Sequence, residues 1–527
     1  MSALVAKVHD MPLWRDMTAK SWYVALVSCT GAAVYGYDVS WWSSVLGMSA
    51  FTQRFGEYNA AEGTYAISAP LQSAGSAVPT AGLVIGSLLC FTISDRIGRR
   101  GAMLATSIMY LIAIIIEVTS NSYAQVVVGR FLNSIPQGMS ASLLPAYQSE
   151  CAPASCRGAL VGLYTWVLDT GAVTAVGIVY NTYQRTDASA YKIVMGVQGI
   201  YPVLILLFLY WLPESPRYLV MKGRDSEALV VLESLRVDKS TAAKELEDIR
   251  ASSQVHQDDS SWMDLVRGPN LRRTVITVFT AGVESWQGLS FIGNYLVVFF
   301  ISLGTTDTYY LVLLINSTLL ITLTLFFWVP DYVGRRRLLL FGSVVMFSTF
   351  FIMAGVAGRD VSTISFTRQR VAVAMLFIWA IVYSSTWANG TWVTIGEMPQ
   401  TRLRSKTSGL AYAVQSISGL VISLFSPYVQ SDAYVNWGAY IGFFFGSFSF
   451  IAFWFVYFFY PEVKGLSIEK MDELFDQRAS IKQFAEAHRG EQVTIAGVVS
   501  GGSSVDVERD AGAEKMASVD VKTETDV

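Results

Sequence analysis

Apolar residues along the chain gather into twelve stretches of about twenty residues each, separated by polar segments. The first six stretches cover residues 23–47, 77–94, 102–119, 124–146, 159–180 and 191–212. The second six cover residues 273–301, 309–330, 338–358, 371–395, 407–429 and 437–460. A helix of about twenty apolar residues crosses the hydrocarbon core of a bilayer, which is about 30 Å thick. The pattern therefore predicts an all-α membrane protein with twelve transmembrane helices.

One long polar segment, residues 213–272, divides these stretches into two sets of six, 23–212 and 273–460. Within it the run RDSEALVVLESLR is amphipathic and predicts short surface helices. A polar start, residues 1–22, precedes the first stretch, and a tail, residues 461–527, follows the last one. After about residue 490 the tail is rich in Gly, Ser, Val and acidic residues and has no aromatic side chain, a composition typical of disorder.

The positive charges predict which way the chain crosses the membrane. Cytoplasmic loops hold an excess of Lys and Arg. If the N-terminus is cytoplasmic, the inner segments hold all but seven of the 38 cations. Arg130 then lies inside a span, and the outer segments hold Arg54, Arg185, Lys192, Arg359, Arg368 and Arg370. This asymmetry predicts that both termini are cytoplasmic.

Composition excludes several classes of function. The chain is 52% hydrophobic and only 15% charged, against about 25% charged in soluble domains. Its formal net charge of −3 gives no basic surplus for binding nucleic acid. The four cysteines show no zinc or disulfide spacing, and the three histidines lie outside the spans. Without HExxH, P-loop or GxSxG motifs the sequence does not indicate an enzyme, and we expect no metal or cofactor.

Three signals in the polar segments repeat between the two halves. DRIGRR at 95–100 returns as DYVGRR at 331–336, and PESPR at 213–217 returns as PEVKG at 461–465. Glu150 and Arg157 are spaced like Glu397 and Arg404. All three signals recur after roughly half the chain and in the same orientation. This indicates a duplication with parallel repeats, related by an axis along the membrane normal.

With these motifs the sequence resembles the sugar porters of the major facilitator superfamily, most of all fungal hexose and α-glucoside (maltose) permeases. The resemblance covers residues 20–480 and also includes GYD at 36–38, GRFLNSIPQG at 129–138 and PAYQSECAPASCRG at 145–158. It implies two six-helix bundles around a central cavity that opens alternately to either side. It further implies a monomeric plasma-membrane protein that transports a hexose or disaccharide together with protons.

Other functions stay open at this stage. The solute could instead be a polyol, a quinate-like acid or a secondary metabolite, moved inward or by efflux. A nutrient-sensing transceptor is a further alternative, although the tail of about forty residues beyond the matching region is short for a signalling tail. In each case a gradient rather than ATP supplies the driving force, because the sequence has no P-loop.

Arg and acidic residues at the inner span ends have two interpretations. They could simply follow the positive-inside rule, but that rule explains neither the paired acids nor the glycines. We favour ion pairs that join the span ends of each half, hold the inner side shut and break for release. In the first half the set is Asp95, Arg99, Arg100, Glu150, Arg157, Glu214 and Arg217; in the second it is Asp331, Arg335, Arg336, Glu397, Arg404 and Glu462.

Charges inside the spans carry more information, because a charge at the bilayer centre costs at least a few kcal/mol. Asp38 and Arg130 lie at depths that differ by about 5 Å, given a rise of 1.5 Å per residue. One interpretation is a static ion pair that fixes helix packing. The other is that Asp38 takes up and releases a proton according to how close Arg130 is. The resemblance favours proton coupling, since proton-coupled sugar porters carry Asp and Arg at these motif positions.

Candidate substrate-binding residues come from the resemblance and depart from the hexose pattern. Glu284 and Ser285 occupy positions where sugar porters usually have glutamines, and Thr165 replaces another glutamine. Asp169 and Glu284 share a depth near the midplane, where they could be helix-packing groups, bind sugar hydroxyls, form a second protonation site or favour a solute other than a plain hexose. The full candidate set is Thr165, Asp169, Glu284, Gln287, Ser290, Asn294, Tyr295, Trp392 and Gln415.

Overall fold

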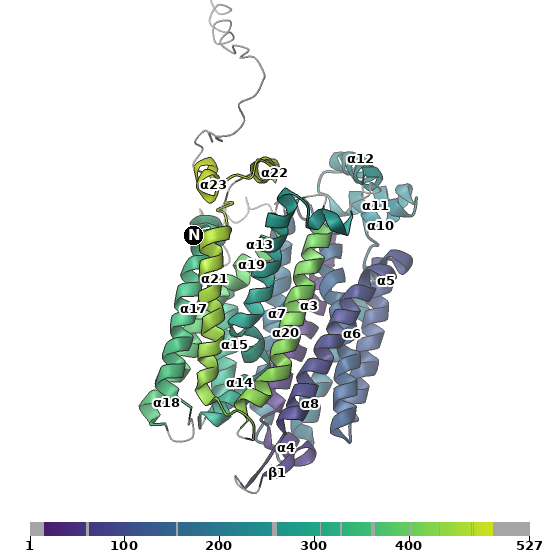
Figure 1. The fold of residues 1–527 in the computed structure, drawn as a ribbon. Helices are drawn as coiled ribbons and strands as arrows, with labels where there is room; N and C mark the ends of the chain where they lie inside the picture. Colours follow the sequence, from purple (N-terminus) through teal and green to yellow (C-terminus); the bar gives the residue numbers. More distant parts are fainter. Residues whose placement is uncertain are drawn as a thin grey trace, which may run out of the picture.

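The computed structural model describes residues 15–59, 63–153, 156–255, 261–305, 307–326, 329–359, 364–400, 403–431, 433–464, 466 and 468–488. The described part is almost entirely helical, and long helices run side by side through the molecule (Figure 1). The predicted disordered tail after residue 490 lies outside the described residues, as do residues 1–14.

The first half contains six membrane-length segments. They are formed by α3 (Ala19–Val45), α5 (Ala69–Val118), α6 (Tyr123–Cys151), α7 (Arg157–Thr182), and the successive helices α8 (Ser189–Val197), α9 (Ile200–Phe208) and η2 (Leu209–Trp211). The 50-residue α5 supplies two of the six, because Gly98 breaks it with φ 85° and ψ 170°. This break separates the second and third predicted spans.

The second half repeats this arrangement. Its segments are α13 (Pro269–Glu284) with the π-helical η4 (Ser285–Leu289) and α14 (Ser290–Ser302), then α15 (Thr308–Phe326), α17 (Arg335–Ala357), α18 (Phe366–Ser385) with α19 (Trp387–Glu397), α20 (Arg404–Gln430), and η7 (Gly438–Tyr440) with α21 (Ile441–Phe459). Twelve segments in two sets of six confirm the predicted fold. Most helices start or end a few residues beyond the apolar stretches, because the helical backbone continues into the polar residues at the ends of each span.

Short elements cover the two ends of the bundle. One end carries α10 (Pro216–Met221), α11 (Asp225–Leu235), α12 (Ser240–Val255), η3 (Trp262–Leu265), α16 (Val329–Val333), α22 (Ile468–Asp476) and α23 (Ile481–His488). The opposite end carries α4 (Ser49–Phe55) and an antiparallel hairpin of β1 (Glu57–Asn59) and β2 (Thr64–Ala66), in which Glu57 pairs with Ala66. The sequence predicted the surface helices of the 213–272 segment but not the hairpin.

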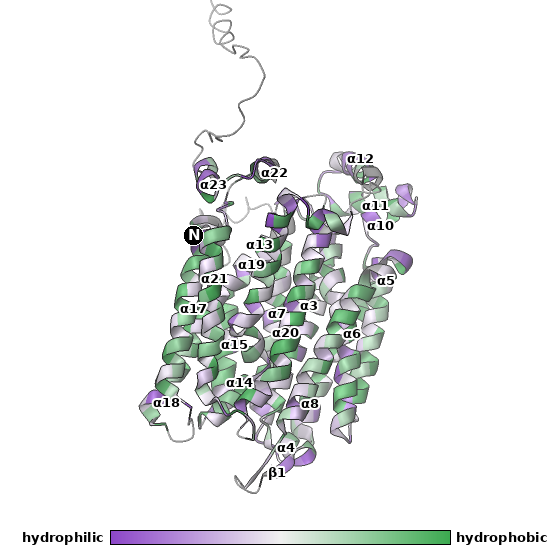
Figure 2. Cartoon of the chain, viewed as in Figure 1, coloured by the Kyte–Doolittle hydropathy of each residue, from purple (hydrophilic) through white to green (hydrophobic). Residues whose placement is uncertain are grey.

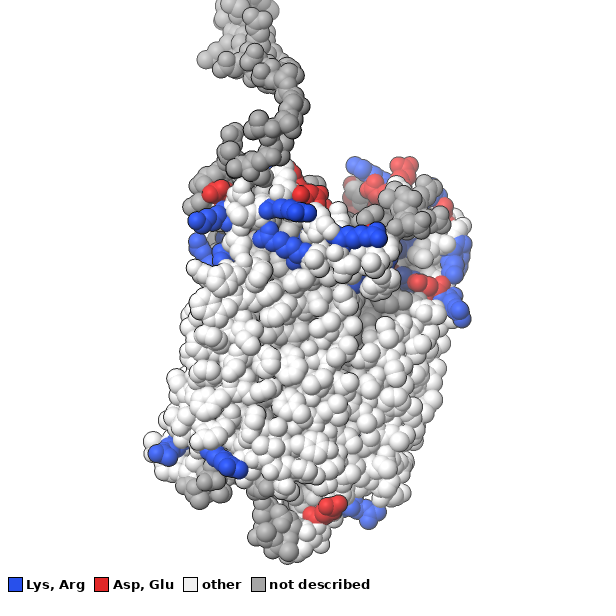
Figure 3. Space-filling model, viewed as in Figure 1, with Lys and Arg blue, Asp and Glu red and all other residues white. Residues whose placement is uncertain are grey.

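The surface has the polarity of a membrane protein. Hydrophobic residues dominate the middle of the bundle and hydrophilic ones its two ends (Figure 2). Lys and Arg form a collar at the end that carries α10–α12 and α22, which we call the basic end, and only a few charged side chains lie at the other (Figure 3). The collar fits the predicted charge asymmetry, and the cytoplasmic location of the basic end stays a prediction.

Among the described residues, nine helical segments are long and apolar enough to cross a membrane by length and composition. The segments below that limit are α3, α6 and the broken α13–α14 segment. Each of them carries polar side chains inside the bundle, including Asp38, Arg130 and Glu284, which are all nearly fully buried. A helix that faces other helices tolerates such groups, whereas one that faces lipid does not.

The two halves contact each other mainly through α3 with α14, α5 with α20, and α7 with α15. At the end opposite the basic end, Ser73 Oγ donates to the Leu424 carbonyl at 2.9 Å. Nearby, the rings of Tyr183 and Tyr309 stack with their centroids 4.4 Å apart. By contrast, α13 packs chiefly on α19, α20 and α21 of its own half. The halves are therefore joined at the end away from the basic collar, and also nearer the collar, where Trp166 Nε1 of α7 donates to Thr324 Oγ1 of α15 at 2.9 Å.

Within the first half, α5 and α6 approach so closely that only glycine fits between them. A Cβ atom added at Gly86 of α5 would lie 1.9 Å from the Ile135 carbonyl oxygen of α6. A Cβ atom added at Gly138 of α6 would lie 2.0 Å from the Leu83 carbonyl oxygen of α5. Small residues allow membrane helices to pack backbone against backbone, which provides much of their association energy.

We therefore expect Gly86→Leu to destabilise the protein strongly. Overpacking a core costs about 1–3 kcal/mol where neighbouring side chains can move, and here the neighbour is backbone. The matched control is Gly355→Leu in α17, where an added Cβ would have no heavy atom within 4 Å. Melting temperatures in detergent and elution profiles on size exclusion compare the variants. Equal stability of the two would contradict the close packing of α5 on α6.

Candidate functional site

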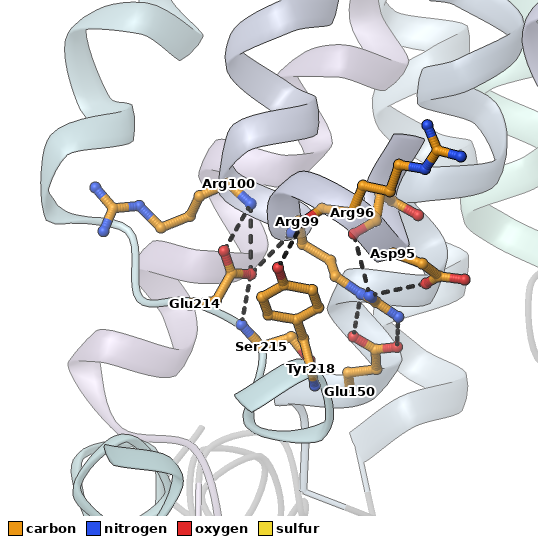
Figure 4. Close-up of polar contacts among 9 residues, drawn as sticks. Asp95, Arg96, Arg99, Arg100, Glu150, Glu214, Ser215 and Tyr218 are labelled. Atoms are coloured by element: carbon orange, nitrogen blue, oxygen red, sulfur yellow. Dashed lines mark hydrogen bonds and ion pairs between the residues drawn. The ribbon is translucent and has the colours of Figure 1, made fainter. Parts of the chain in front are cut away.

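Glu214, at the basic end of the first half, caps the helical segment that starts after the break in α5. Because Gly98 has left-handed backbone, Arg99 and Arg100 start a new helical segment whose N–H groups lack intrahelical partners. The Glu214 carboxylate accepts hydrogen bonds from Arg99 N at 2.9 Å and from Arg100 N at 3.3 Å (Figure 4). A side chain at position 98 would collide with this carboxylate, at 2.4 Å from Oε2. The glycine and the glutamate therefore form one structural unit.

The Arg99 side chain joins this unit to α6. Its Nε and Nη2 atoms each donate to Glu150 at 3.1 Å, one to each carboxylate oxygen, and Nη1 contacts Asp95 at 3.2 Å (Figure 4). Arg99 and Glu150 side chains are each only 11% exposed. A bidentate pair of this kind fixes both distance and orientation. It ties the α5 break to the end of α6.

The second half repeats the glycine, the capping glutamate and the arginine–glutamate pair of this unit. Gly334 has φ 96°, and the Glu462 carboxylate accepts from Arg335 N at 3.0 Å and Arg336 N at 3.2 Å. Arg335 Nη2 pairs with Glu397 at 3.0 Å, as Arg99 pairs with Glu150. The duplication found in the sequence is thus a duplication of one capping and ion-pair arrangement, and each copy lies within its own half.

Several residues that were predicted to form these ion pairs make other contacts instead, or form no ion pair among the described residues. Glu214 and Glu462 bind backbone N–H groups, while the guanidinium groups of Arg100 and Arg336 donate to backbone carbonyls at helix ends. Arg217 is exposed and has no ion pair among the described residues. Arg404 Nε and Nη2 are buried without a hydrogen-bond partner in the described part of the chain. The side chains of Arg157 and Asp331 lie outside what the structure describes.

Asp38 and Arg130 meet inside the first bundle, as their predicted depths require. Arg130 Nη2 lies 3.5 Å from Asp38 Oδ2, and both side chains are about 5% exposed or less. Asp38 Oδ1 also accepts from Trp41 Nε1 at 3.0 Å and from Asn133 Nδ2 at 3.1 Å. The Arg130 guanidinium lies 4.1 Å from the centre of the Trp42 ring and donates to the Gly75 carbonyl. The pair is held in place, but at 3.5 Å its charged atoms are not in close contact.

A further carboxyl group in this region escaped the sequence analysis. Glu117, near the end of α5, is completely buried, and Gln198 Nε2 donates to its Oε2 at 2.5 Å. The available signal was a lone acid in the apolar run IAIIIEV. Its place two residues from the end of the predicted 102–119 span made it resemble an interfacial residue. Only the packing of α5 against α6 shows that it faces inward.

Glu284 lies where the seventh segment is interrupted. It is the last residue of α13, next to the π-helical turn in which Gly288 has φ 102°. Tyr383 OH donates to Glu284 Oε1 at 2.7 Å, and Gln415 Nε2 donates to Oε2 at 2.9 Å. π-Helical turns inside α-helices are frequent at functional sites. The predicted candidates Glu284 and Gln415 therefore form one polar cluster, to which the structure adds Tyr383.

Asp169 approaches this cluster from the other half. It is half-buried, and no hydrogen bond or ion pair involves it among the described residues. Its charge and that of Glu284 both act on Tyr383. Thr165 lies one turn earlier on α7 and is also half-buried. The two acids that the sequence placed at one depth therefore lie on helices of opposite bundles, Asp169 on α7 and Glu284 on α13.

The remaining candidates divide into accessible and enclosed groups. Trp392 is 39% exposed, and its ring lies 5.3 Å from that of Tyr412. Gln287 is fully buried, and neither of its amide atoms has a hydrogen-bond partner among the described residues. Tyr295 is also fully buried, with its hydroxyl donating to the Ser423 carbonyl at 2.8 Å.

The other polar groups of α14 turn toward α20 as Tyr295 does. Asn294 Nδ2 donates to the Ser290 carbonyl at 2.8 Å, and Ser290 Oγ lies close to Gly419. In this conformation the Tyr295 hydroxyl is bound to α20 and Asn294 Nδ2 lies 3.5 Å from Ser423 Oγ of α20, while Asn294 and Ser290 are half-buried. The prediction missed this because spacing in the sequence cannot tell which face of α14 meets α20.

The family model described as "Sugar (and other) transporter" matches residues 24–475. Among curated proteins, the chain is 27% identical to the major facilitator-type transporter ecdD of Aspergillus rugulosus, over 86% of this chain and 88% of the relative. It is also 27% identical to the high-affinity glucose transporter ght5 of Schizosaccharomyces pombe, over 84% of this chain and 82% of the relative.

The fold is similar to that of solved transporters. The proton:xylose symporter XylE, bound to 6-bromo-6-deoxy-D-glucose, superimposes with a TM-score of 0.70 at 21% identity, covering 87% of this chain and 99% of XylE. The inward-open XylE from E. coli gives 0.71 at 21% identity, covering 86% and 99%. At this identity the likeness concerns the fold, and it confirms the two-bundle architecture.

Because the Arg99–Glu150 pair fixes the ends of α5 and α6 relative to each other within the first half, we expect Arg99→Ala to loosen the basic end and to raise access to the interior from there. Partly exposed pairs contribute up to about 1 kcal/mol, and a change of 1 kcal/mol alters a ratio of two states about fivefold. Maleimide labelling of a cysteine introduced by Tyr412→Cys, a position 38% exposed, reports on access from this end. The four native cysteines are buried and give little background.

The control for Arg99→Ala is Arg217→Ala, which removes an exposed arginine from the same end without breaking an ion pair of the described residues. We expect labelling of the control to equal that of the parent protein. Equal labelling of the Arg99→Ala variant would show that the pair does not restrain opening.

Proposed function

Because the chain belongs to the sugar (and other) transporter family, we propose that it carries a sugar across the membrane together with protons. The buried Asp38–Arg130 pair is the observation that carries this proposal. A carboxylate deep in a bundle has a large desolvation cost, and it is retained where its ionisation is used. The name of the related glucose transporter supports a hexose as the solute.

The pair can couple proton and solute movement through the strength of one contact. Arg130 stabilises ionised Asp38, while Trp41 and Asn133 hold the carboxylate in position. A proton on Asp38 removes its attraction to Arg130, so that α3 and α6 can change their separation. When Arg130 returns, it favours loss of the proton. Transport is then driven by the proton gradient, with no cofactor.

The contacts between the halves fit one state of an alternating-access cycle. At the end opposite the basic collar the halves meet through the Tyr183–Tyr309 stack, and nearer the collar Trp166 of α7 donates to Thr324 of α15. We take the basic end to be cytoplasmic and the protein to be a plasma-membrane monomer. In the opposite state the halves would separate at the end that carries Tyr183. The Arg99 unit would then lie against the second half, and the Arg335 unit against the first.

Around the break in the seventh segment, the polar groups suit a neutral solute with several hydroxyls. Asp169 and Glu284 provide acceptors, Gln287 provides an unpartnered amide, and Trp392 provides an apolar ring face. No cation among the described residues pairs with Asp169 or Glu284, so an anionic solute would meet carboxyl groups and no positive charge to balance its own. The same chemistry admits a polyol as the second candidate class.

We expect Asp38→Asn to abolish accumulation of sugar against its gradient while sparing exchange of labelled for unlabelled sugar. The amide keeps the shape and accepts from Trp41, but it cannot bind and release a proton in this pH range. Uptake of labelled glucose in a transporter-null yeast, with and without a protonophore, measures accumulation, and counterflow in vesicles measures exchange. Continued accumulation by the variant, or a parent protein insensitive to the protonophore, would sink the coupling proposal.

Glu284→Gln is expected to change which solutes are accepted. It replaces a carboxylate by an amide and disturbs the hydrogen bonds from Tyr383 and Gln415, each worth about 1 kcal/mol or more. We expect at least a fivefold change in the relative uptake of glucose, maltose, lactose, cellobiose and a polyol. Tyr383→Phe, which removes one donor and keeps the acid, serves as the control. An unaltered ranking in the Glu284 variant would remove this residue from the solute site.

A further inference from the structure

Glu117 places a second carboxyl group beside the Asp38–Arg130 pair. It is completely buried, and Gly129, the residue before Arg130, packs directly on its side chain: a Cβ added there would lie 2.7 Å from Glu117 Cγ. The charges of Asp38 and Arg130 both act on Glu117. Three ionisable groups from α3, α5 and α6 therefore share one enclosed region.

Two amide side chains connect the carboxyl groups. Asn133 Nδ2 donates to Asp38 Oδ1 at 3.1 Å and lies 3.4 Å from Gln198 Oε1. Gln198 Nε2 in turn donates to Glu117 Oε2 at 2.5 Å. Both amides are buried, Gln198 completely. The chain Asp38–Asn133–Gln198–Glu117 is thus a continuous hydrogen-bonded path between an acid of α3 and an acid of α5.

The hydrogen bonds that are missing indicate where a proton resides. Glu117 Oε1 and Asn133 Oδ1 are both buried acceptors without a donor among the described residues. Asn133 is also within interaction range of Glu117. Burying two acceptors without a donor is unfavourable, because each loses its hydrogen bonds to water. A proton on Glu117 Oε1 would turn one of these two unpartnered acceptors into a donor.

Charge balance also favours one bound proton in this cluster. With both carboxyl groups ionised, the enclosed cluster carries two negative charges and the single positive charge of Arg130. With one proton bound, it is neutral. A low-dielectric environment favours the neutral arrangement, because every uncompensated charge there costs several kcal/mol. The cluster is therefore neutral with one exchangeable proton, and either of the two carboxyl groups can hold that proton.

We propose that Glu117 is a second proton-binding group of the coupling site and shares one proton with Asp38. This inference rests on the proposed proton coupling. In the present conformation Glu117 holds the proton and Asp38 pairs with Arg130. Transfer breaks the O–H bond on Glu117 and forms one on Asp38, and ionised Glu117 then becomes the partner of Arg130. Release of the proton from the cluster leaves both carboxyl groups ionised.

The groups around Glu117 determine how its titration responds to substitution. Asp38 faces it from α3 and Arg130 from α6, while Gln198 from the α8–α9 junction carries no charge. The packed helices also bring the phenols of Tyr110 of α5 and Tyr201 of α9 into the neighbouring apolar cluster. Asp38 and Arg130 are therefore the charges that set the proton affinity of Glu117.

Glu117→Gln tests the proposal through the pH dependence of uptake. In the parent protein, loading one proton changes the cluster charge from −1 to zero. In the variant, loading changes it from zero to +1, because Arg130 then has no anionic partner. We expect the pH of half-maximal uptake to move at least about one unit toward acid, a fold-change of ten in proton affinity. Glu117→Asp keeps the carboxyl group and is expected to retain the parent midpoint.

Gln198→Leu is a second variant, for which we expect the pH of half-maximal uptake to shift in the opposite direction. It removes the donor that stabilises ionised Glu117, so the cluster holds its proton more firmly and the midpoint should move toward alkaline pH. Surface expression and counterflow exchange show that each variant is folded. An unchanged midpoint in Glu117→Gln, or a lower maximal rate without a midpoint shift, would overturn the proposal and leave Glu117 as a packing group. If uptake by the parent protein does not depend on pH or the protonophore, the coupling proposal itself fails.

Discussion

A charge inside the hydrocarbon of a bilayer is tolerated only when the protein supplies its partners, and the architecture of this chain follows from that constraint. Cations outside the core of the bundle gather in a collar at one end (Figure 3). Asp38, Arg130, Glu117 and Glu284 are instead enclosed by helices and bound by Trp, Asn, Gln and Tyr side chains. The helices that carry three of these groups, α3, α6 and α13, are the ones that hydropathy alone does not mark as spans. Polar content there is compatible with the membrane because these helices face protein.

The same need for partners explains the repeated units at the basic end. A left-handed glycine turns the chain between two antiparallel helices, and the helix that starts after it exposes unpaired N–H groups. Glu214 and Glu462 satisfy these groups in the two halves, while Arg99 and Arg335 each pair with a further glutamate. The glutamates thus act chiefly as helix caps. Each copy lies within its own bundle, so each bundle can move as a rigid body relative to the other.

The two polar clusters of the interior are built differently. In the first bundle, amides link Asp38 and Glu117 and no part of the network is more than slightly exposed. Glu284 of the second bundle is enclosed, but Asp169 across from it is half-buried without a partner among the described residues. A closed network suits an exchangeable proton, and a partly open one suits a solute. The proposed proton cluster thus lies within the first bundle, whereas the candidate solute cluster takes Glu284 from the second bundle and Asp169 from the first.

The sequence by itself determined the twelve helices, the duplication and the meeting of Asp38 with Arg130, because hydropathy, repeated motifs and depth along a helix are properties of local order. Tertiary structure alone decided which atoms are partners. The Glu214 carboxylate binds backbone rather than guanidinium groups, Arg217 is left exposed, and Tyr295 turns into α20. Glu117 lies near the end of a predicted span, and only its packing against α6 shows that it is buried. Such outcomes depend on the rotation of each helix about its axis, which is set by contacts between residues far apart in the chain.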